Sequence, residues 1–416
     1  MPQPSAITLS SELIARLDSG SPVISIDQLS QASPTADPGR TLELISSVGE
    51  FISWGIADPE NGVIRILARD IEDRPDDRFL INRVRNAMKL RQRLGLIPVD
   101  SSIKNAFRLI HGEGDGLSGF YSDVYGDFVI QYVLARGLRE WGRRLAGAIA
   151  SVAQELDLCT EEGTPWPRGV LQKVRGKGSA RPGKPVQSVV HGEEPPEKLL
   201  VEDNGVRFEI HPLAGLNVGL FNDMREHRWR LGRFARNATV LNTFAYTCSL
   251  SVAAALNGAR EVTSVDLSSG VLKWARENFR LAGLDADQHH FEVADISRFL
   301  QQAKKEGKLY DLVILDPPTY SAARASSWSM KRDLADMISK ALALIPDGGI
   351  LWFCGNSYQL SDQELTLRIA AGARNAGRCL ALLESGGLPP DFPTPIAFKE
   401  SRYLKLRIFR VGSSFF

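Results

Sequence analysis

Residues 240–285 read VLNTFAYTCSLSVAAALNGAREVTSVDLSSGVLKWARENFRLAGLD, and this stretch decides the fold. Two short apolar runs, VLNTF and EVTSVD, have the length and composition of buried strands. Each is followed by a segment with helical spacing, and Gly283 stands just past the second one, where a C-cap glycine belongs. We therefore predict strands at 240–244 and 261–266 and helices at Ser249–Asn257 and Ser269–Leu281.

The same alternation continues to the end of the chain. It predicts further strands at 289–293, 310–316, 349–355 and 403–411, and further helices at Ile296–Lys305, Lys331–Ile345 and Ser361–Ala376. The last helix opens with a capping box, Ser361 with Glu364. Strands that alternate with helices form a mainly parallel sheet covered on both faces. The sequence thus predicts a doubly wound α/β domain over residues 200–416.

Two smaller regions precede this domain. Residues 1–72 read as short strands and turns, punctuated by Gly49, Gly55 and Gly62, which indicates a small β-rich module. In residues 73–199 we predict an amphipathic helix at Arg78–Leu94, a β-meander with tight turns from Asn105, and a second helix at about Leu138–Leu156. We expect three domains: 1–72, a central α+β domain at 73–199, and 200–416.

Composition excludes several classes of protein. The 416 residues carry 50 Lys and Arg against 49 Asp and Glu, so the chain is not uniformly basic. Its four cysteines form no C-x-x-C pair, which argues against a disulfide framework or a metal site and favours a reducing cytoplasm. No apolar run approaches the roughly 18 residues of a membrane span, and the first residues lack the features of a signal peptide. We expect a cytoplasmic protein with no membrane partner.

Acidic residues follow three of the predicted parallel strands, where such sheets bind ligands. Asp266 ends the second strand, 22 residues beyond Phe244, at the place of an acid that binds ribose hydroxyls. Asp295 follows the third strand and is placed to accept from an adenine amino group. The backbone amides after the first strand can receive a charged ligand tail. The alternatives are an ordinary acid at a helix start for Asp266 and a helix cap for Asp295.

The chain has no G-x-G-x-x-G sequence, so a ligand with ribose and adenine but no pyrophosphate fits better than a dinucleotide. The fourth strand stops at a rigid turn, Asp316-Pro317-Pro318-Thr319-Tyr320. Such a turn can hold a planar nitrogenous base by hydrogen bonds while Tyr320 stacks on it. A plain strand-ending turn is the alternative.

Together these residues resemble the class I S-adenosylmethionine-dependent methyltransferases. Residues 240–285 are similar to the cofactor segment of the bacterial large-subunit ribosomal RNA base methyltransferases. Three further motifs of that family occur in order, at Asn105–Asp127, Gly192–Pro196 and Gly219–Arg228, the last matching G-x-F-x-D-x-R-x-x-R. The resemblance implies a seven-stranded, Rossmann-like methyltransferase domain at residues 200–416 and a PUA-like RNA-binding module at the N-terminus. It also implies S-adenosyl-L-methionine as cofactor and 23S ribosomal RNA or the assembling large subunit as partner. A homodimer is left open.

The resemblance also implies the site residues. Those expected to bind the cofactor are Phe221, Asp223, Arg225, Thr243, Phe244, Tyr246, Asp266, Leu267, Asp295, Ile296 and Asp316. Those expected to hold the target base are Asp316, Pro317, Pro318, Tyr320 and Asn356. The motif places Arg225 and Arg228 beside the cofactor, with a structural pairing to Asp223 or Glu226 as the alternative.

Two departures from the family pattern bear on the chemistry. Cys248 stands where the family has glycine, so a side chain can crowd the methionine tail of the cofactor. The cytosine-C5 branch of the family has a nucleophilic cysteine at the position of Asn356, and asparagine cannot be that nucleophile. Cys354 lies two residues earlier on the same side of the strand, as a candidate nucleophile or a buried structural cysteine.

The guanine-N7 branch resembles this chain more closely, in DPPTYS and GGILWFCGN. Guanine N7 already holds a lone pair, so its methylation needs positioning and no covalent intermediate. We therefore expect methyl transfer to a ring or exocyclic nitrogen, with guanine favoured. The alternatives are cytosine-C5 transfer using Cys354 and a catalytically inactive RNA-binding factor.

RNA contact needs positive charge, and residues 165–184 carry no acid. The candidate contacts are Arg168, Lys173, Arg175, Lys177, Arg181 and Lys184, with Arg139, Arg143 and Arg144 on the preceding helix. A solvated charged surface is the alternative explanation of this cluster.

Overall fold

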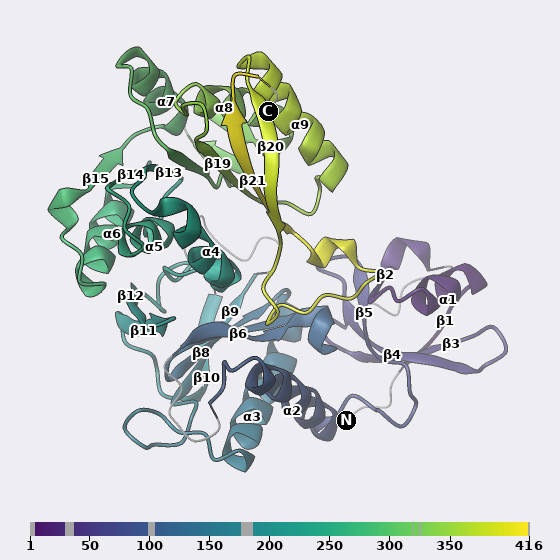
Figure 1. Ribbon diagram of the computed structural model, residues 1–416. Coiled ribbons are helices and arrows are strands. Elements are labelled where there is room, and N and C mark those ends of the chain that lie inside the picture. The colour runs from purple at the N-terminus through teal and green to yellow at the C-terminus, as the bar shows by residue number, and fades with distance from the viewer. Residues whose placement is uncertain are drawn as a thin grey trace. The chain divides into compact units, whose positions relative to one another are not determined.

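A computed structural model describes residues 5–29, 37–98, 105–175, 186–318, 320–323 and 326–414 (Figure 1). The chain divides into two compact units. The first unit comprises Met1–Asn204, Ile210–Val218 and Pro390–Ser401, and the second comprises Gly205–Glu209, Gly219–Pro389 and Arg402–Phe416. Two segments expected in the C-terminal domain, Ile210–Val218 and Pro390–Ser401, therefore belong to the first unit. A linear reading of the chain does not separate them, because both are short segments inside the region predicted as one domain.

The N-terminal part of the first unit is a five-stranded sheet with the strand order β1-β3-β4-β5-β2. Its strands are β1 Ser5–Thr8, β2 Val23–Ser25, β3 Thr41–Ile45, β4 Phe51–Asp58 and β5 Val63–Ala68. This confirms the β-rich module. The helix α1, Ser11–Asp18, was not predicted, although Ser10 caps it by accepting from the Leu13 amide at 3.4 Å.

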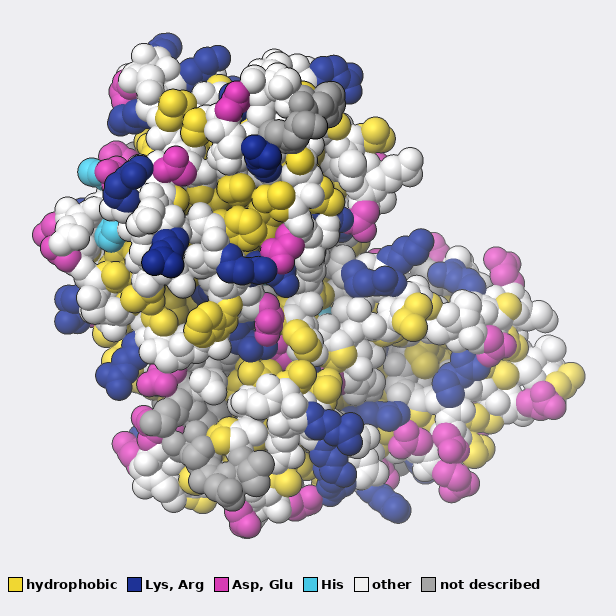
Figure 2. Space-filling model, viewed as in Figure 1, with side chains coloured by type: hydrophobic (Ala, Val, Ile, Leu, Met, Phe, Trp, Pro, Cys, Tyr) yellow, Lys and Arg dark blue, Asp and Glu magenta, His cyan; other side chains and the backbone are white. Residues whose placement is uncertain are grey.

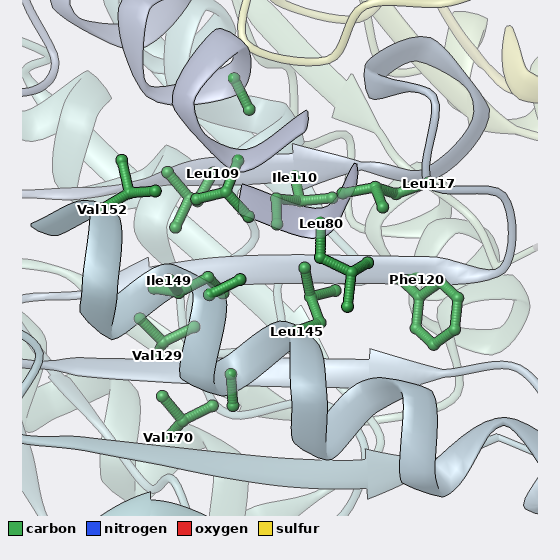
Figure 3. Packing of buried hydrophobic residues seen from close by; sticks show 14 of the residues in the cluster. Leu80, Leu109, Ile110, Leu117, Phe120, Val129, Leu145, Ile149, Val152 and Val170 are labelled. Atoms are coloured by element: carbon green, nitrogen blue, oxygen red, sulfur yellow. The ribbon is translucent and has the colours of Figure 1, made fainter. Parts of the chain in front are cut away.

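The central part of the first unit packs two helices on a second five-stranded sheet, in the order β10-β9-β8-β7-β6. The helices are α2 Asp77–Arg93 and α3 Arg139–Glu155, and the strands are β6 Ala106–His111, β7 Phe120–Tyr125, β8 Phe128–Val133, β9 Gly169–Val174 and β10 Val186–Gly192. The predicted meander is β6–β8, and both predicted helices are present. Figure 3 shows Leu80 of α2 and Leu145 and Ile149 of α3 packed among strand residues of one buried cluster.

The second unit contains a seven-stranded sheet in the order β15-β14-β13-β16-β19-β21-β20, with β21 antiparallel to both of its neighbours. Its strands are β13 Thr239–Thr243, β14 Glu261–Asp266, β15 His290–Val293, β16 Leu312–Leu315, β19 Ile350–Asn356, β20 Cys379–Gly386 and β21 Leu404–Gly412. Its helices are α4 Arg225–Ala235, α5 Ser249–Leu256, α6 Ser269–Leu281, α7 Ile296–Lys305, α8 Met330–Leu342 and α9 Asp362–Asn375. The fold-class prediction is confirmed, although β20 and α4 were missed.

Alternation along the central strands explains why helices cover both faces of this sheet (Figure 1). Val240, Ile314 and Trp352 pack in one cluster with α4 and α5. Their chain neighbours Leu241 and Phe353 pack in another cluster with α7, α8 and α9. Because β13, β14, β15, β16 and β19 are parallel, their carboxyl ends meet at one edge, which we call the carboxyl edge.

Shorter elements complete the chain. Two strands, β11 Leu199–Asp203 and β12 Val206–Ile210, flank Asn204 and Gly205, whose φ values of 54° and 78° are those of a tight turn. A short two-stranded sheet is formed by β17 Tyr320–Ala323 and β18 Ser326–Ser329. The 3₁₀ helices are η1 Ile26–Gln28, η2 Gly112–Asp115, η3 Arg136–Leu138, η4 Asn222–Met224, η5 Ala286–Gln288 and η6 Lys399–Ser401.

Charge on the face seen in Figure 2 is mixed, with Lys and Arg side chains interspersed among Asp and Glu. Within the described ranges, none of the helices has both the length and the apolar character that a membrane span requires.

Candidate cofactor and target-base site

The loop after β13 has an unusual backbone. Phe244, Tyr246 and Cys248 have φ values of 57°, 49° and 64°, so every second residue is in the left-handed region. Such a conformation costs a residue with a side chain roughly 1–2 kcal/mol. At Cys248 this explains why the family motif has glycine there.

The amides of this loop are used within the protein. Ala245 N donates to Val265 O at 3.0 Å, Tyr246 N to Asp266 Oδ2 at 3.0 Å, and Cys248 N to Ala245 O at 2.8 Å. These three donors are therefore not available to a ligand. The expectation that the loop amides receive a charged ligand tail therefore does not extend to Ala245, Tyr246 and Cys248.

Asp266 ends β14 and is held in one orientation. Its Oδ2 accepts from Tyr246 N and its Oδ1 accepts from Ser268 N at 3.0 Å. A carboxylate offers about four acceptor positions, so two bonds leave capacity for a pair of hydroxyls. Leu267 beside it is 57% exposed, which provides an apolar surface next to the carboxylate.

The segment Gly219–Asp223 lies against the same loop. Thr247 Oγ1 donates to Gly219 O, and the rings of Phe221 and Tyr246 lie 5.2 Å apart. Gly219 has a φ of 120°, and a Cβ there would lie 2.1 Å from the Trp274 ring, so no larger residue fits. The G-x-F-x-D-x-R motif is thus a turn that starts from this close backbone approach, and it presents Phe221, which is 40% exposed.

Two carboxyl groups meet where β16 ends. Desolvation, with a smaller contribution from the Asp223 carboxylate, raises the pKa of Asp316 to about 7. The Tyr403 hydroxyl donates to Asp223 Oδ2 at 3.0 Å. Sequence reasoning missed Tyr403, which directly precedes β21; the signal available was its place as the first residue of the predicted last strand. A cationic group beside this acid pair would stabilise both carboxylates.

Asn356 and Cys354 differ sharply in accessibility. Asn356 is exposed at the end of β19, whereas Cys354 has no exposed surface and its Sγ lies 3.6 Å from Met224 Sδ. Burial, and to a lesser extent the carboxylates of Asp316 and Asp223, raise the pKa of the Cys354 thiol well above its ordinary value. Cys354 therefore has the environment of a buried structural cysteine.

Several predicted residues have structural partners. Asp295 caps α7 by accepting from Arg298 N at 3.0 Å, and Ile296 is buried beneath it. Thr243 Oγ1 donates to Ile314 O at 2.8 Å, so its hydroxyl is committed to the sheet. The helix-cap alternative left open for Asp295 is present.

The two motif arginines are also engaged. Arg225 forms a 3.5 Å ion pair with Glu226, which is the structural alternative, and Arg228 Nη1 donates to Phe221 O at 3.0 Å. In the Asp-Pro-Pro turn, Pro317 is buried and Pro318 exposed. Only the backbone of Tyr320 is described, so its stacking role stays a prediction.

Lys173 is wrongly assigned by the sequence prediction of RNA contacts. It lies in β9 with 0% of its surface exposed, and its Nζ donates to Ala214 O at 3.1 Å and Gly215 O at 2.7 Å. A fully buried ammonium held by two carbonyls cannot contact a nucleic acid.

The other basic candidates have different positions. Arg168 and Arg175 are exposed at the two ends of β9, Arg168 paired with Glu193 at 2.7 Å. Lys177, Arg181 and Lys184 lie outside the described residues. On α3, Arg139 is exposed, Arg143 pairs with Glu140 at 3.4 Å and Arg144 with Asp77 at 2.8 Å.

Comparison with known proteins identifies the family of this chain. Residues 177–410, more than half of the chain, match the family model for S-adenosylmethionine-dependent methyltransferases. The chain belongs to this family. Residues 7–69 match a PUA-like domain. This methyltransferase uses S-adenosylmethionine as its cofactor.

Two curated relatives and one solved structure cover almost the whole methyltransferase. YwbD of Bacillus subtilis, named among the ribosomal RNA large subunit methyltransferases, is 29% identical over 96% of this chain and 98% of its own. Ribosomal RNA large subunit methyltransferase I of Aeromonas salmonicida is 30% identical over 89% of this chain and 90% of its own. The structure of SMU.776, described as a methyltransferase complexed with SAH, is similar in fold, with a TM-score of 0.84, 24% identity and coverage of 97% and 100%.

The carboxyl edge suits this cofactor. S-adenosylmethionine carries a sulfonium and an ammonium group, and the Asp316–Asp223 pair is a desolvated acidic environment in which a cation is stabilised. Asp266 has acceptor capacity for ribose hydroxyls, and Phe221 and Leu267 offer exposed apolar surface. When bound, the cofactor supplies an electrophilic methyl group.

Proposed function

We propose that this methyltransferase modifies a base of 23S ribosomal RNA, in free RNA or in the assembling large subunit, and that the favoured acceptor is a guanine nitrogen. The substrate class is supported by the two relatives named ribosomal RNA large subunit methyltransferases, since each match covers about nine-tenths or more of both chains. The N-terminal PUA-like domain gives the chain a second part suited to RNA.

The environment of β19 favours a nitrogen acceptor over cytosine C5. A cytosine-C5 reaction needs a thiolate that attacks the base, and a thiolate forms only where its pKa is lowered or a base is adjacent. Asn356 occupies the accessible end of β19, and Cys354 is buried beside two carboxylates that disfavour its ionisation. A nitrogen acceptor with its own lone pair needs no thiolate.

The chain's own residues then position the base. The Asp316 carboxylate, when ionised, accepts hydrogen bonds from ring or amino N–H groups of a guanine, and Pro317 and Pro318 fix the turn that carries it. Asn356 at the neighbouring strand end can donate to a base oxygen. In-line alignment of the acceptor nitrogen with the methyl donor supplies most of the catalysis.

Nucleoside mass spectrometry tests the proposal. The protein is incubated with 23S RNA and labelled S-adenosylmethionine, and the digested RNA is analysed. We expect labelled methylguanosine, from the wild type and from Cys354→Ala alike. Labelled 5-methylcytidine that disappears in Cys354→Ala, with the variant still folded, would establish the cytosine alternative.

The inactive RNA-binding alternative is tested separately. Direct calorimetric titration with S-adenosylmethionine should show binding at one site. No binding by the folded protein, together with no label in RNA, would favour an inactive factor.

A further inference from the structure

The last strand of the second unit begins beside the end of the strand that carries Asn356. β21 is antiparallel to β19, and Leu404, its first residue, is the direct cross-strand partner of Asn356 (Figure 1). The beginning of β21 therefore lies at the carboxyl edge, where the parallel strands end. Residues that are distant from the site in the chain are thereby placed next to it.

Bonds between the two strands continue for one residue beyond Asn356. Ser357 N donates to Tyr403 O at 2.9 Å, and Ser357 O accepts from Lys405 Nζ at 2.7 Å. Ser357 is 5% exposed, so its backbone groups need these partners in place of water. Because strand ends fray where no bond follows, the two bonds also hold Asn356, the residue just before them.

Lys405 is a buried lysine on a face of the sheet that packs against helices. Alternation along β21 puts it on the same face as Phe409 and Val411, which pack in the cluster with α7, α8 and α9. Its side chain is only 9% exposed, and desolvation lowers the pKa of its ammonium group. Burial of an ammonium is unfavourable unless the group is hydrogen-bonded, which points to a role for its bond to the Ser357 carbonyl.

Tyr403, the residue just before β21, contacts the other side of the site. Its hydroxyl donates to Asp223 Oδ2 at 3.0 Å, while its backbone carbonyl accepts from Ser357 N. The Asp223 carboxylate interacts in turn with Asp316, whose pKa it helps to raise. The beginning of β21 thus contacts both the strand end expected to hold the target base and the acid pair expected to face the cofactor.

We propose that Tyr403 and Lys405, which we call the β21 clamp, are positioning residues for the two halves of the site. Lys405 positions the strand end that carries Asn356, for the target base, and Tyr403 positions the Asp223 carboxylate, for the cofactor. The inference rests on the proposed function, which assigns Asn356 to the base and Asp223 to the cofactor. Both clamp residues act through the groups that they hold.

Lys405→Met tests the base side, because it keeps the length and volume of the side chain and removes its charge and donors. In the full-length protein, Tm reports folding, calorimetry reports S-adenosylmethionine affinity, and labelled methyl transfer to 23S RNA gives kcat and KM. We expect kcat/KM for RNA to fall about tenfold, with cofactor affinity within about twofold of wild type. Amide exchange should accelerate at Ser357 and its neighbours and stay unchanged in β13 and β16.

Tyr403→Phe tests the cofactor side, because it removes one hydroxyl and leaves the backbone bond to Ser357 in place. We expect S-adenosylmethionine to bind about fivefold more weakly, while KM for RNA stays within about twofold of wild type. The two substitutions should therefore change different constants. A loss of general stability would instead change cofactor affinity and RNA turnover together.

Two controls in the same unit match the clamp substitutions in chemistry. Tyr310→Phe removes a buried hydroxyl that bonds Thr263, at the amino end of β16, away from the carboxyl edge. Lys308→Met removes an exposed lysine that is paired with Glu306 at 2.9 Å. Both should leave cofactor affinity and RNA turnover unchanged.

A second substitution at Lys405 covers the case in which Lys405→Met does not fold. Lys405→Gln keeps a polar end but is shorter than lysine, so its amide should not reach Ser357 O. It should show the same loss in kcat/KM for RNA, again without a change in cofactor affinity.

Asn356→Ala and Asp223→Asn separate failure of this inference from failure of the proposed site. If they lower RNA turnover and cofactor affinity, respectively, while the folded clamp variants match wild type, the β21 clamp is excluded and the site stands. If cofactor affinity and RNA turnover fall together in each clamp variant, the two residues serve general stability and the inference is wrong. If neither Asn356→Ala nor Asp223→Asn has an effect, the proposed site is wrong, and the inference with it.

Discussion

Two regions were predicted to be functional: the carboxyl edge of the seven-stranded sheet, and the basic residues in and beside β9 of the central sheet. They differ in how well the prediction located their side chains. At the carboxyl edge, Asp266, Asp316 and Asn356 stand at the ends of β14, β16 and β19, where the strand pattern put them. At the central sheet, Lys173 was predicted at the surface and has no exposed surface at all.

The difference lies in the kind of reasoning. Residues at strand ends were located by period and topology, which fix the edge at which a side chain emerges. The basic cluster was identified by composition, which does not say whether a side chain points into the core or toward solvent. Lys173 stands within the strand Gly169–Val174, all six residues of which are buried. Arg168 and Arg175, just outside the strand, are exposed.

The largest expected effect comes from Asp316, where the edge is most desolvated. Asp316→Asn should lower kcat/KM by at least about 100-fold, because a neutral amide neither balances the cofactor cation nor accepts as a carboxylate does. Cofactor affinity of the wild type should rise with pH between 6 and 8 as the carboxyl ionises, whereas the variant should show no such rise. A pH-independent wild type would remove Asp316 from the site.

The same substitution should stabilise the fold. The folded-state pKa of Asp316, about 7, lies above the ordinary value of 3.8, so the folded state holds this proton more tightly than the unfolded chain. Its contribution to stability is therefore lost as pH rises from about 4 to 7 and stays lost above that. The gain in Tm of Asp316→Asn over wild type should be larger at pH 8 than at pH 5; an equal gain would contradict the raised pKa.

Substitution of Asp266 tests whether a residue predicted from its place at a strand end also contacts the cofactor. Asp266→Ala should weaken S-adenosylmethionine binding at least about tenfold, or about 1.4 kcal/mol, measured by calorimetry. Part of this loss comes through the loop, because Tyr246 N loses its acceptor. Asp287→Ala, an exposed acid paired with Arg276 at 3.0 Å, is the matched control. Equal affinities in the two variants would exclude Asp266.

Much of the fold was predictable because hydrophobic period and helix caps are local signals. The helices α6 and α7 were predicted to the residue, and the capping box of Ser361 and Glu364 is present. What failed depends on distant contacts. The strand β20 has a half-exposed, irregular pattern with a bulge after Leu382, so its period was not visible. The return of Pro390–Ser401 to the first unit has no local signature at all.

Within the site, the sequence located acidic positions but not their partners. Tyr403 and Asp223 are 180 positions apart in the chain, and three of the loop amides expected for a ligand donate instead to Ala245, Val265 and Asp266. Such pairings follow from tertiary geometry, which spacing in the chain does not encode.

A moderate effect is expected for the two exposed arginines beside β9, Arg168 and Arg175. Such an effect would support the prediction of RNA contacts for these two residues. The double substitution Arg168→Ala with Arg175→Ala should weaken RNA binding several-fold and reduce the magnitude of the salt slope by about 1–2, as loss of one or two phosphate contacts does. Filter binding across a salt series measures both, and Arg143→Ala on α3 is the comparison. An unchanged slope would make both arginines ordinary solvated charges.

The smallest effect is expected at Cys248, where the sequence left a doubt about crowding of the cofactor. Its side chain is fully buried, and its thiol lies against the hydroxyls of Ser251 and Ser264, inside the domain. Cys248→Gly should therefore leave S-adenosylmethionine affinity within about twofold of wild type. Its stability should change by no more than about 1 kcal/mol, because relief of the left-handed backbone offsets the lost packing. Cys248→Val should instead destabilise, since a β-branched residue tolerates a φ of 64° poorly. A tenfold gain in affinity for Cys248→Gly would mean that the thiol crowds the ligand. The side chains of the carboxyl edge, like those of the basic cluster, would then have been predicted only in part from the sequence.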